Sequence, residues 1–212
     1  MLYFRDPYCT NTHMKHITLG AEPLHYFHYE AIAQGKAILS LSAKASERIR
    51  KSRAFLEAKT ARSERPIYGV NTGFGSLCNV EISPEQLGQL QTNLVRSHAC
   101  GAGDYVRVEV IRLMLALKVE SFAKGVSGIR LSVVESLIQM YNSGALPVIF
   151  QQGSLGASGD LAPLAHMSLP LLGEGAMWLD GEIQETSAVL PVLGDRAWTP
   201  CELASKEGLA LL

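Results

Sequence analysis

The sequence predicts a mainly α-helical fold with one small β-hairpin and two long loops. Three observations favour this fold: several stretches carry apolar residues at helical spacing, residues typical of helix starts precede them, and glycine-rich stretches without that spacing separate them. Apolar residues make up 47 % of the 212 residues and charged residues 18 %. This balance allows a sizeable buried core and is not typical of a disordered chain.

The expected helices follow one another along the chain with short breaks. Ser42 can cap a long helix rich in Ala, Lys, Arg and Glu, and Pro84 suits the first helical position of the next helix. A break at residues 101–104 precedes another helix, and Asp160 can cap a later one that has Pro163 in its first turn. The expected helices cover about residues 24–34, 42–62, 83–98, 105–124, 131–142, 160–172 and a last stretch from about residue 200. For the helix at 105–124, the residues expected near one apolar face are Val110, Leu113, Leu117 and Phe122.

Two loops and one hairpin complete the predicted organisation. Residues 66–80 and 147–159 are glycine-rich, partly apolar and without helical spacing. Loops of this length in a compact helical protein are usually functional or disordered, and their partly apolar character favours function. Asp180 and Gly181 lie between short apolar pairs, so residues 178–183 are expected to form a small β-hairpin.

The charge balance and the cysteines exclude several classes of protein. Lys plus Arg is 19 and Asp plus Glu is 20, which gives no electrostatic reason to bind nucleic acid or an anionic membrane. No apolar run reaches the length of a signal peptide or of a membrane span. The four cysteines lie far apart and form no CxxC pair, so we expect reduced thiols in a cytoplasmic protein. They are Cys9, Cys78, Cys100 and Cys201.

Histidines near the N-terminus raise the question of a metal site. His13 with His16, and His25 with His28, each have HxxH spacing. No cysteine or carboxylate partners complete a ligand set, so we expect no metal. We expect His166 to have a structural role.

The string GSLGASGDLAPLAH at residues 153–166 is the strongest candidate for chemistry. Ser158 has Gly156 two residues before it but Asp160 two residues after it, so it does not form a GxSxG nucleophile elbow. No Gly-Lys-Ser/Thr follows, which excludes a phosphate-binding P-loop. Taken alone, the Ala-Ser-Gly triplet is more often part of an ordinary glycine-rich loop that Asp160 caps.

The triplet has a specific chemical possibility if the loop is tight. The amide nitrogen of Gly159 can attack the carbonyl carbon of Ala157 and close a five-membered ring, since glycine has no Cβ to block the approach. Loss of the former carbonyl oxygen as water gives an imidazolone. Loss of the Ser158 hydroxyl as a second water leaves an exocyclic methylene, which is an electrophile.

Two further strings have a less specific pattern when taken alone. Residues 67–76 read IYGVNTGFGS, which suits a surface loop or a nucleotide loop, although Cys78 stands where GxGxxG needs its third glycine. Residues 91–101 read QTNLVRSHACG. His98 in this string can hydrogen-bond a ligand through either ring nitrogen or be satisfied by local backbone groups.

Together, these three strings resemble the aromatic amino acid ammonia-lyase family, which includes histidine, phenylalanine and tyrosine ammonia-lyases. The resemblance runs from about Ile17 to the last residue and is nearest to the histidine-specific members, which carry Ser-His where this chain has Ser97 and His98. It implies a 4-methylidene-imidazole-5-one group formed from the triplet, with no external cofactor. The residues that would form it are Ala157, Ser158 and Gly159.

The resemblance also implies a reaction and a role for other residues. Ammonia is eliminated from L-histidine without oxidation to give trans-urocanate. On this resemblance, Tyr68 would be the base that removes the β-proton and His98 would bind the substrate imidazole. Asp160, which borders the triplet, would cap the next helix and aid ring closure. The electrophile captures the substrate at its amine or at its ring, and the residues leave both open. A phenylalanine or tyrosine ammonia-lyase or aminomutase remains an alternative.

The ends of the chain suggest a fragment of a longer protein, and the resemblance implies that the full-length enzyme is a homotetramer. Residues 1–13 resemble an upstream extension, because residues 14–18 read like a natural start. Residues 14–212 are then the N-terminal lyase domain. Residues 206–212 match a family segment that continues into an active-site asparagine, so we expect the central helical bundle to be truncated. An inactive fragment that only folds or associates is therefore the alternative from another functional class.

Overall fold

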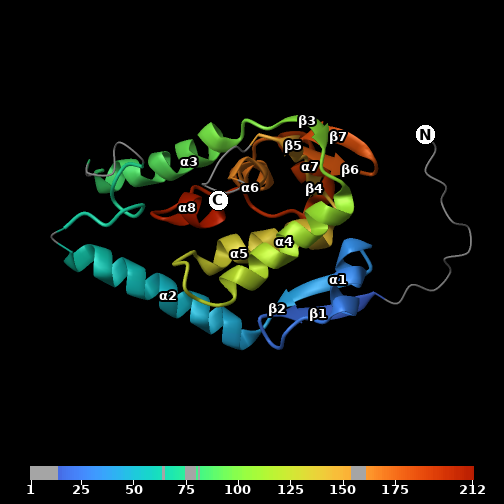
Figure 1. Ribbon diagram of the computed structural model, residues 1–212, viewed down its shortest axis with the longest axis horizontal. Helices are drawn as coiled ribbons and strands as arrows, with labels where there is room; N and C mark the ends of the chain where they lie inside the picture. Colours follow the sequence, from blue (N-terminus) through green and yellow to red (C-terminus); the bar gives the residue numbers. More distant parts are fainter. Residues whose placement is uncertain (1–13, 64, 75–79, 81, 154–160) are drawn as a thin grey trace, which may run out of the picture.

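The computed structural model describes residues 14–63, 65–74, 80, 82–153 and 161–212. These residues form a mainly α-helical fold, which confirms the predicted fold class (Figure 1). The α-helices are α1 (Tyr26–Ala33), α2 (Ala43–Arg62), α3 (Leu87–His98), α4 (Val108–Phe122), α5 (Leu131–Ser143), α6 (Leu161–Ser168), α7 (Thr186–Leu193) and α8 (Glu207–Leu211). The 3₁₀ helices are η2 (Pro84–Gln86), η3 (Leu169–Leu172) and η4 (Gly194–Arg196). The strands are β1 (Lys15–Leu19), β2 (Ala37–Leu41), β3 (Ala102–Tyr105), β4 (Leu146–Pro147), β5 (Phe150–Gln152), β6 (Ala176–Leu179) and β7 (Glu182–Glu185).

The pair α4 and α5 lies at the centre of the molecule and contributes much of its hydrophobic core (Figure 1). On α4, Ile111, Leu115 and Val119 recur every fourth residue, which places them on one face, and each is at most 1 % exposed. α5 packs against α4 and buries Leu137 and Met140 completely. The central pair is therefore the part of the core against which several other elements pack.

The buried face of α4 differs from the predicted one. Phe122 is buried and Leu113 is partly buried against the core, as expected, but Val110 and Leu117 are 43 % and 48 % exposed. Apolar residues occur almost all around this helix, so their spacing is compatible with more than one buried face. The packing of α1 and α5 against α4 decides which face is buried.

The sequence does not predict the two short strands near its start. β1 and β2 pair in parallel, with α1 as the connection between them. Ile17, Leu19 and Leu39 point into the core. The side chain of Asn142 on α5 extends the pairing: its Oδ1 accepts from the N–H of Leu39 at 2.8 Å, and its Nδ2 donates to the carbonyl of Leu39 at 2.8 Å. The sequence did not predict β1 and β2 because strands of this length are too short to show clearly the alternation of apolar and polar residues.

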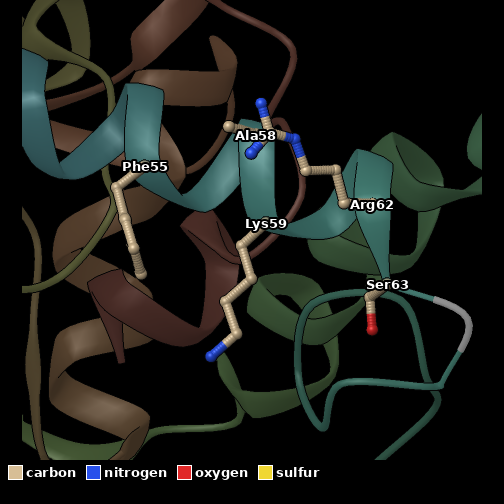
Figure 2. Close-up of a pocket in the computed structure, with 5 residues that line it drawn as sticks. All are labelled: Phe55, Ala58, Lys59, Arg62 and Ser63. Carbon is tan, nitrogen blue, oxygen red and sulfur yellow. The ribbon is translucent and has the colours of Figure 1, made fainter.

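The helix α2 begins at the predicted cap and then leaves the core. The hydroxyl of Ser42 accepts from the N–H of Ala45 at 3.1 Å, and the buried residues of α2, Ala45 and Ile49, both lie near this end. A hollow of about 450 Å³ lies along the other end, where Figure 2 shows Phe55 and Lys59 extending to the same side. It is lined by Phe55, Ala58, Lys59, Arg62 and Ser63, none of which is a predicted site residue. Within the described part of the chain, no helix is long and apolar enough to cross a membrane.

Short strands occupy two stretches where the sequence predicts a break and a loop. β3 pairs antiparallel with β5, which lies inside the loop expected at 147–159. The predicted hairpin is confirmed, because β6 and β7 pair antiparallel with Leu179 opposite Glu182. Asp180 and Gly181 between them have φ values of 51° and 85°, and a two-residue turn of type I′ needs positive φ at both positions.

The C-terminal part contains an unpredicted helix and a later last helix. The prediction of a helix from about residue 200 is wrong, because residues 197–204 form no helix and α8 begins at Glu207. Lys206 has a φ of 70°, which separates α8 from the preceding segment. α7 contains Pro191, a residue that argues against a helix interior when only the sequence is read.

Candidate active site

Tyr68 lies in a tight turn that its own backbone and two side chains close. The carbonyl of Ile67 accepts from the N–H of Asn71 at 3.2 Å, and Oδ1 of Asn71 accepts from the N–H of Ile67 at 2.6 Å. The buried hydroxyl of Thr72 accepts from the N–H of Gly69 at 3.3 Å. The Tyr68 side chain is 57 % exposed. The turn at residues 67–72, which we call the Tyr68 turn, therefore presents the phenol outward from the described part of the chain.

His98 is the last residue of α3. The predicted helix start at Pro84 is a 3₁₀ turn, η2, and α3 follows it from Leu87. Nδ1 of His98 lies 2.8 Å from the carbonyl oxygen of Leu94 and 3.2 Å from the hydroxyl of Ser97. A carbonyl only accepts, so Nδ1 carries the proton in this arrangement and the neutral ring presents Nε2 as an acceptor. Among the described residues, the hydrogen bonds of this ring all use Nδ1. Local groups therefore orient His98 through one nitrogen, and the other can accept from a ligand.

The predicted reactive triplet and its neighbour lie outside the described residues; these are Ala157, Ser158, Gly159 and Asp160. Their two flanks are described. β5 leads into Gly153 on one side, and α6 begins at Leu161 on the other, with Pro163 in its first turn as predicted. A Cβ atom on Gly153 would lie 2.9 Å from the Cβ of Ala162. The two flanks therefore touch, and the chain leaves and re-enters the described structure at neighbouring points.

His166 joins these flanks to the residues that follow α3. Its Nε2 accepts from the N–H of Gly101 at 2.9 Å, and its ring packs edge-on against Phe150 with 5.0 Å between ring centres. A Cβ atom on Gly153 would lie only 2.8 Å from the Cα of Gly101. Burial lowers the pKa of His166, which favours the neutral ring that can accept this hydrogen bond. We call Gly101, Phe150, Gly153, Ala162 and His166 the flank junction.

The N-terminal histidines and the cysteines form no metal centre in the described structure. The N–H of His25 donates to Nδ1 of His28 at 3.1 Å where α1 begins, so this HxxH pair belongs to a helix start. Over the described ranges, no group of three or more His, Cys, Asp or Glu residues could hold a metal ion. Cys100 and Cys201 are free thiols, whereas Cys9, His13 and Cys78 lie outside the described residues.

A buried ion pair next to the Tyr68 turn is absent from the sequence-based predictions. The Glu207 side chain is 0 % exposed, and its Oε1 and Oε2 accept from Nε and Nη2 of Arg130 at 2.8 Å and 2.6 Å. The Glu207 carboxylate raises the pKa of Arg130. The sequence offered one signal for this pair, a carboxylate directly before the apolar residues at the end of the chain. A carboxylate that is buried with such residues is seldom unpaired, so a cationic partner could have been expected.

Comparison with known proteins shows the family to which the chain is similar. The family model described as aromatic amino acid lyase matches residues 24–212. A histidine ammonia-lyase of Shewanella pealeana is 44 % identical over 199 residues, which cover 94 % of this chain and 38 % of the relative.

Two solved structures are similar over most of this chain. Histidine ammonia-lyase from Trypanosoma cruzi matches with a TM-score of 0.81 and 37 % identity, over 92 % of this chain and 37 % of that one. Tyrosine aminomutase from Streptomyces globisporus matches with a TM-score of 0.82 and 36 % identity, over 92 % of this chain and 36 % of that one. The chain spans less than two fifths of the length of these relatives. From the family model and these identities, the chain belongs to the aromatic amino acid lyase family.

Proposed function

We propose that the chain is the N-terminal part of an ammonia-lyase that converts L-histidine to trans-urocanate and ammonia without oxidation. The observation that carries this proposal is the string GSLGASGDLAPLAH at residues 153–166 in a chain of this family. The pair Ser97 and His98, together with relatives named histidine ammonia-lyase, supports histidine as the substrate.

Ala157, Ser158 and Gly159 would supply the methylidene-imidazolone group, and their described surroundings fit it. The flank junction brings Gly153 and Ala162 into contact, and ring closure needs the chain between such flanks to be compressed. Asp160 would aid this closure. Once formed, the group supplies an electrophile that eases loss of the amine or of the β-proton. No external cofactor is required.

Tyr68 and His98 have geometries that suit the two roles proposed for them. The exposed Tyr68 side chain can approach a bound substrate, and in its phenolate form its oxygen would accept the β-proton. Nε2 of His98 can accept a hydrogen bond from the N–H of a substrate imidazole while Leu94 orients the ring. In the assembled enzyme, Tyr68 and Ser158 must both reach one amino acid, so they must lie within the span of that substrate.

The proposal includes the setting in which the enzyme works. We infer a homotetramer in the cytoplasm with a small amino acid as the only ligand, and neither nucleic acid nor membrane as partner. The free thiols of Cys100 and Cys201 are consistent with a reducing compartment. Gel filtration of the whole enzyme that contains this chain tests the assembly, and a monomer with full activity would contradict it.

The variant Ser158→Ala tests the central claim in that whole enzyme. Alanine has no hydroxyl to lose, so we expect urocanate formation, followed by ultraviolet absorbance, to be abolished while the fold is kept. The intact mass of the parent should show the loss of two waters, and that of the variant should not. Ser121→Ala, an exposed change on α4, serves as the matched control and should keep both properties. Near-normal turnover by Ser158→Ala would refute the proposal.

A second candidate is a phenylalanine or tyrosine ammonia-lyase or aminomutase. The similarity to tyrosine aminomutase, with a TM-score of 0.82, supports this second candidate. Assays of the whole enzyme with histidine, phenylalanine and tyrosine separate these activities, and analysis for β-amino acid products detects a mutase. Preference for tyrosine or phenylalanine would replace the histidine assignment and leave the family unchanged.

A third candidate, an inactive fragment that only folds or associates, concerns the 212-residue chain alone. Phe55, Val110 and Leu117 are exposed apolar side chains of the kind that promote association. We expect the isolated chain to associate and to form no urocanate. A monomeric and active chain would show that the 212 residues are sufficient for the reaction.

A further inference from the structure

The buried carboxylate of Glu207 connects segments that are far apart in the sequence. Besides pairing with Arg130, its Oε1 accepts from the backbone N–H of Arg130 at 2.9 Å and its Oε2 from the N–H of Ala204 at 2.7 Å. Nη1 of Arg53, on α2, lies 3.9 Å from the carboxylate and donates to the carbonyl of Ser205 at 3.0 Å. Two arginines from different elements therefore hold residues 204–211, which we call the C-terminal segment.

The C-terminal segment supports the Tyr68 turn directly. The hydroxyl of Ser205 donates to the carbonyl of Val70 at 2.6 Å. The side chain of Leu209 fills the space beside Gly69, so that a Cβ atom at residue 69 would overlap it. Val70 is 2 % exposed although Tyr68 beside it is 57 % exposed. The turn is therefore fixed from its inner side, while the phenol remains accessible on its outer side.

The same segment also fixes α3. The N–H of Leu209 donates to Oε1 of the fully buried Gln91 at 3.2 Å. A Cβ atom on Gly208 would lie 2.5 Å from the carbonyl oxygen of Gln91, so the two backbones are in close contact. Since α3 ends at His98, the C-terminal segment sets the position of the Tyr68 turn relative to the helix that carries His98 (Figure 1).

We propose that Ser205 and Glu207 are positioning residues for Tyr68: Ser205 holds the Tyr68 turn through Val70, and Glu207 holds Ser205 in place through Arg53 and Arg130. Their effect on catalysis rests on the proposed function, in which Tyr68 is the base. Their effect on the turn does not, because it follows from the contacts alone. The two parts can therefore be tested separately.

Hydrogen exchange of the 212-residue chain, followed by mass spectrometry, tests the contacts. In Ser205→Ala, the amides of residues 69–73 should exchange about fivefold faster, the effect of one lost hydrogen bond, while those of α5 stay unchanged. Ser205→Thr keeps a hydroxyl and should restore protection. Ser121→Ala is the control for the loss of a serine hydroxyl elsewhere. Unchanged exchange at 69–73 in Ser205→Ala, or an equal change across the whole chain, would overturn the proposal.

Glu207→Gln tests the other half of the proposal with Glu202→Gln as its control. Glu202 is an exposed carboxylate beside the same segment, whereas Glu207 is fully buried. Faster exchange at both 69–73 and 204–211 is expected for Glu207→Gln and not for Glu202→Gln. If Glu207→Gln fails to fold, Arg53→Gln takes its place, because it removes the link through which Glu207 is proposed to hold Ser205. Protection of 69–73 that persists in a folded Glu207→Gln chain would remove Glu207 from the assignment.

Kinetics of the whole enzyme test the consequence for the reaction. A misplaced base lowers kcat, so Ser205→Ala should reduce kcat by about 10-fold to 100-fold with little change in KM, and Ser205→Thr should recover it. Tyr68→Phe provides the discriminating comparison. If Tyr68→Phe turns over normally, the proposed base is wrong, while the exchange result still decides the positioning contacts. A normal kcat in Ser205→Ala, with Tyr68→Phe inactive, would overturn the positioning role.

Discussion

The Tyr68 turn carries one predicted catalytic residue, and the flank junction supports the loop that contains the predicted triplet. Different interactions hold these two regions in place. The Tyr68 turn rests on the C-terminal segment, which a buried carboxylate and two arginines hold. The flank junction consists of closely packed glycines and one imidazole that must stay neutral to accept its hydrogen bond. The first arrangement should be sensitive to loss of charge, and the second to added volume and to protonation.

The largest effect on stability is expected from Glu207→Gln. This variant removes the buried negative charge that holds the C-terminal segment, on which the Tyr68 turn rests. The variant leaves the partly exposed Arg130 without the charge of the buried Glu207 carboxylate, so the free energy of unfolding should fall by about 3 kcal/mol. Urea denaturation of the 212-residue chain measures this change, with the exposed Glu202→Gln expected within about 0.5 kcal/mol of the parent. If Glu207→Gln and Glu202→Gln were equally stable, the Tyr68 turn would not depend on the buried charge, and charge would not distinguish it from the flank junction.

The corresponding change in the flank junction is Gly153→Ala, which adds volume without changing charge. A Cβ atom there would lie 2.8 Å from the Cα of Gly101, so the variant should lose about 2–3 kcal/mol in the same denaturation experiment. Gly144→Ala is the matched control, because Gly144 has a φ of 81° but no atom within 4 Å of an added Cβ. It should lose about 1 kcal/mol, from backbone conformation alone. A larger loss in Gly144→Ala would show that crowding is not what defines the flank junction.

The variant His98→Leu examines α3, which packs against α8 of the C-terminal segment and against α6 of the flank junction. Loss of a hydrogen bond to the substrate should lower kcat/KM for histidine by about 1–3 kcal/mol of transition-state stabilisation in the whole enzyme. The two-water mass loss of the triplet should be unaffected, because His98 lies outside it. Unchanged kinetics with histidine would remove His98 from the site.

The smallest effect is a pH dependence confined to the flank junction. An unfolded imidazole titrates at about 6.5, and burial lowers the pKa of His166 in the folded chain. The folded state therefore binds fewer protons, so this contribution to stability is complete above pH about 6.5 and is lost as the pH falls through that value towards the lower folded pKa. Amide exchange at Gly101 between pH 8 and pH 5 should show the loss.

His166→Gln provides the comparison for this titration. Glutamine keeps a hydrogen-bond acceptor but does not titrate, so the protection of Gly101 should become nearly independent of pH. His16→Gln, an exposed change on β1, should leave the pH dependence as it is in the parent. If His166→Gln keeps the full pH dependence, another group controls the junction.

Features that depend on neighbouring residues were predictable from the sequence. Ser42 caps α2 because its hydroxyl meets an N–H in the first turn of the same helix. Asp180 and Gly181 make the hairpin turn because both tolerate positive φ. The strings around Tyr68 and His98 indicated candidate site residues through their resemblance to a family, and the roles of these residues remain predictions. The string at Ser158 lies outside the described residues and remains a prediction.

Features that depend on distant residues required the tertiary structure. Glu207 is buried beside Arg130, and nothing near either residue in the sequence indicates that they meet. The buried face of α4 and the strand pair β1–β2 were missed for the same reason, because the elements that cover them come from other parts of the chain. The sequence by itself determined the local turns, caps and motif strings, through interactions that span a few residues. Only the tertiary structure decided which carboxylate is buried and what supports Tyr68, because burial depends on the packing of segments that are far apart in the chain.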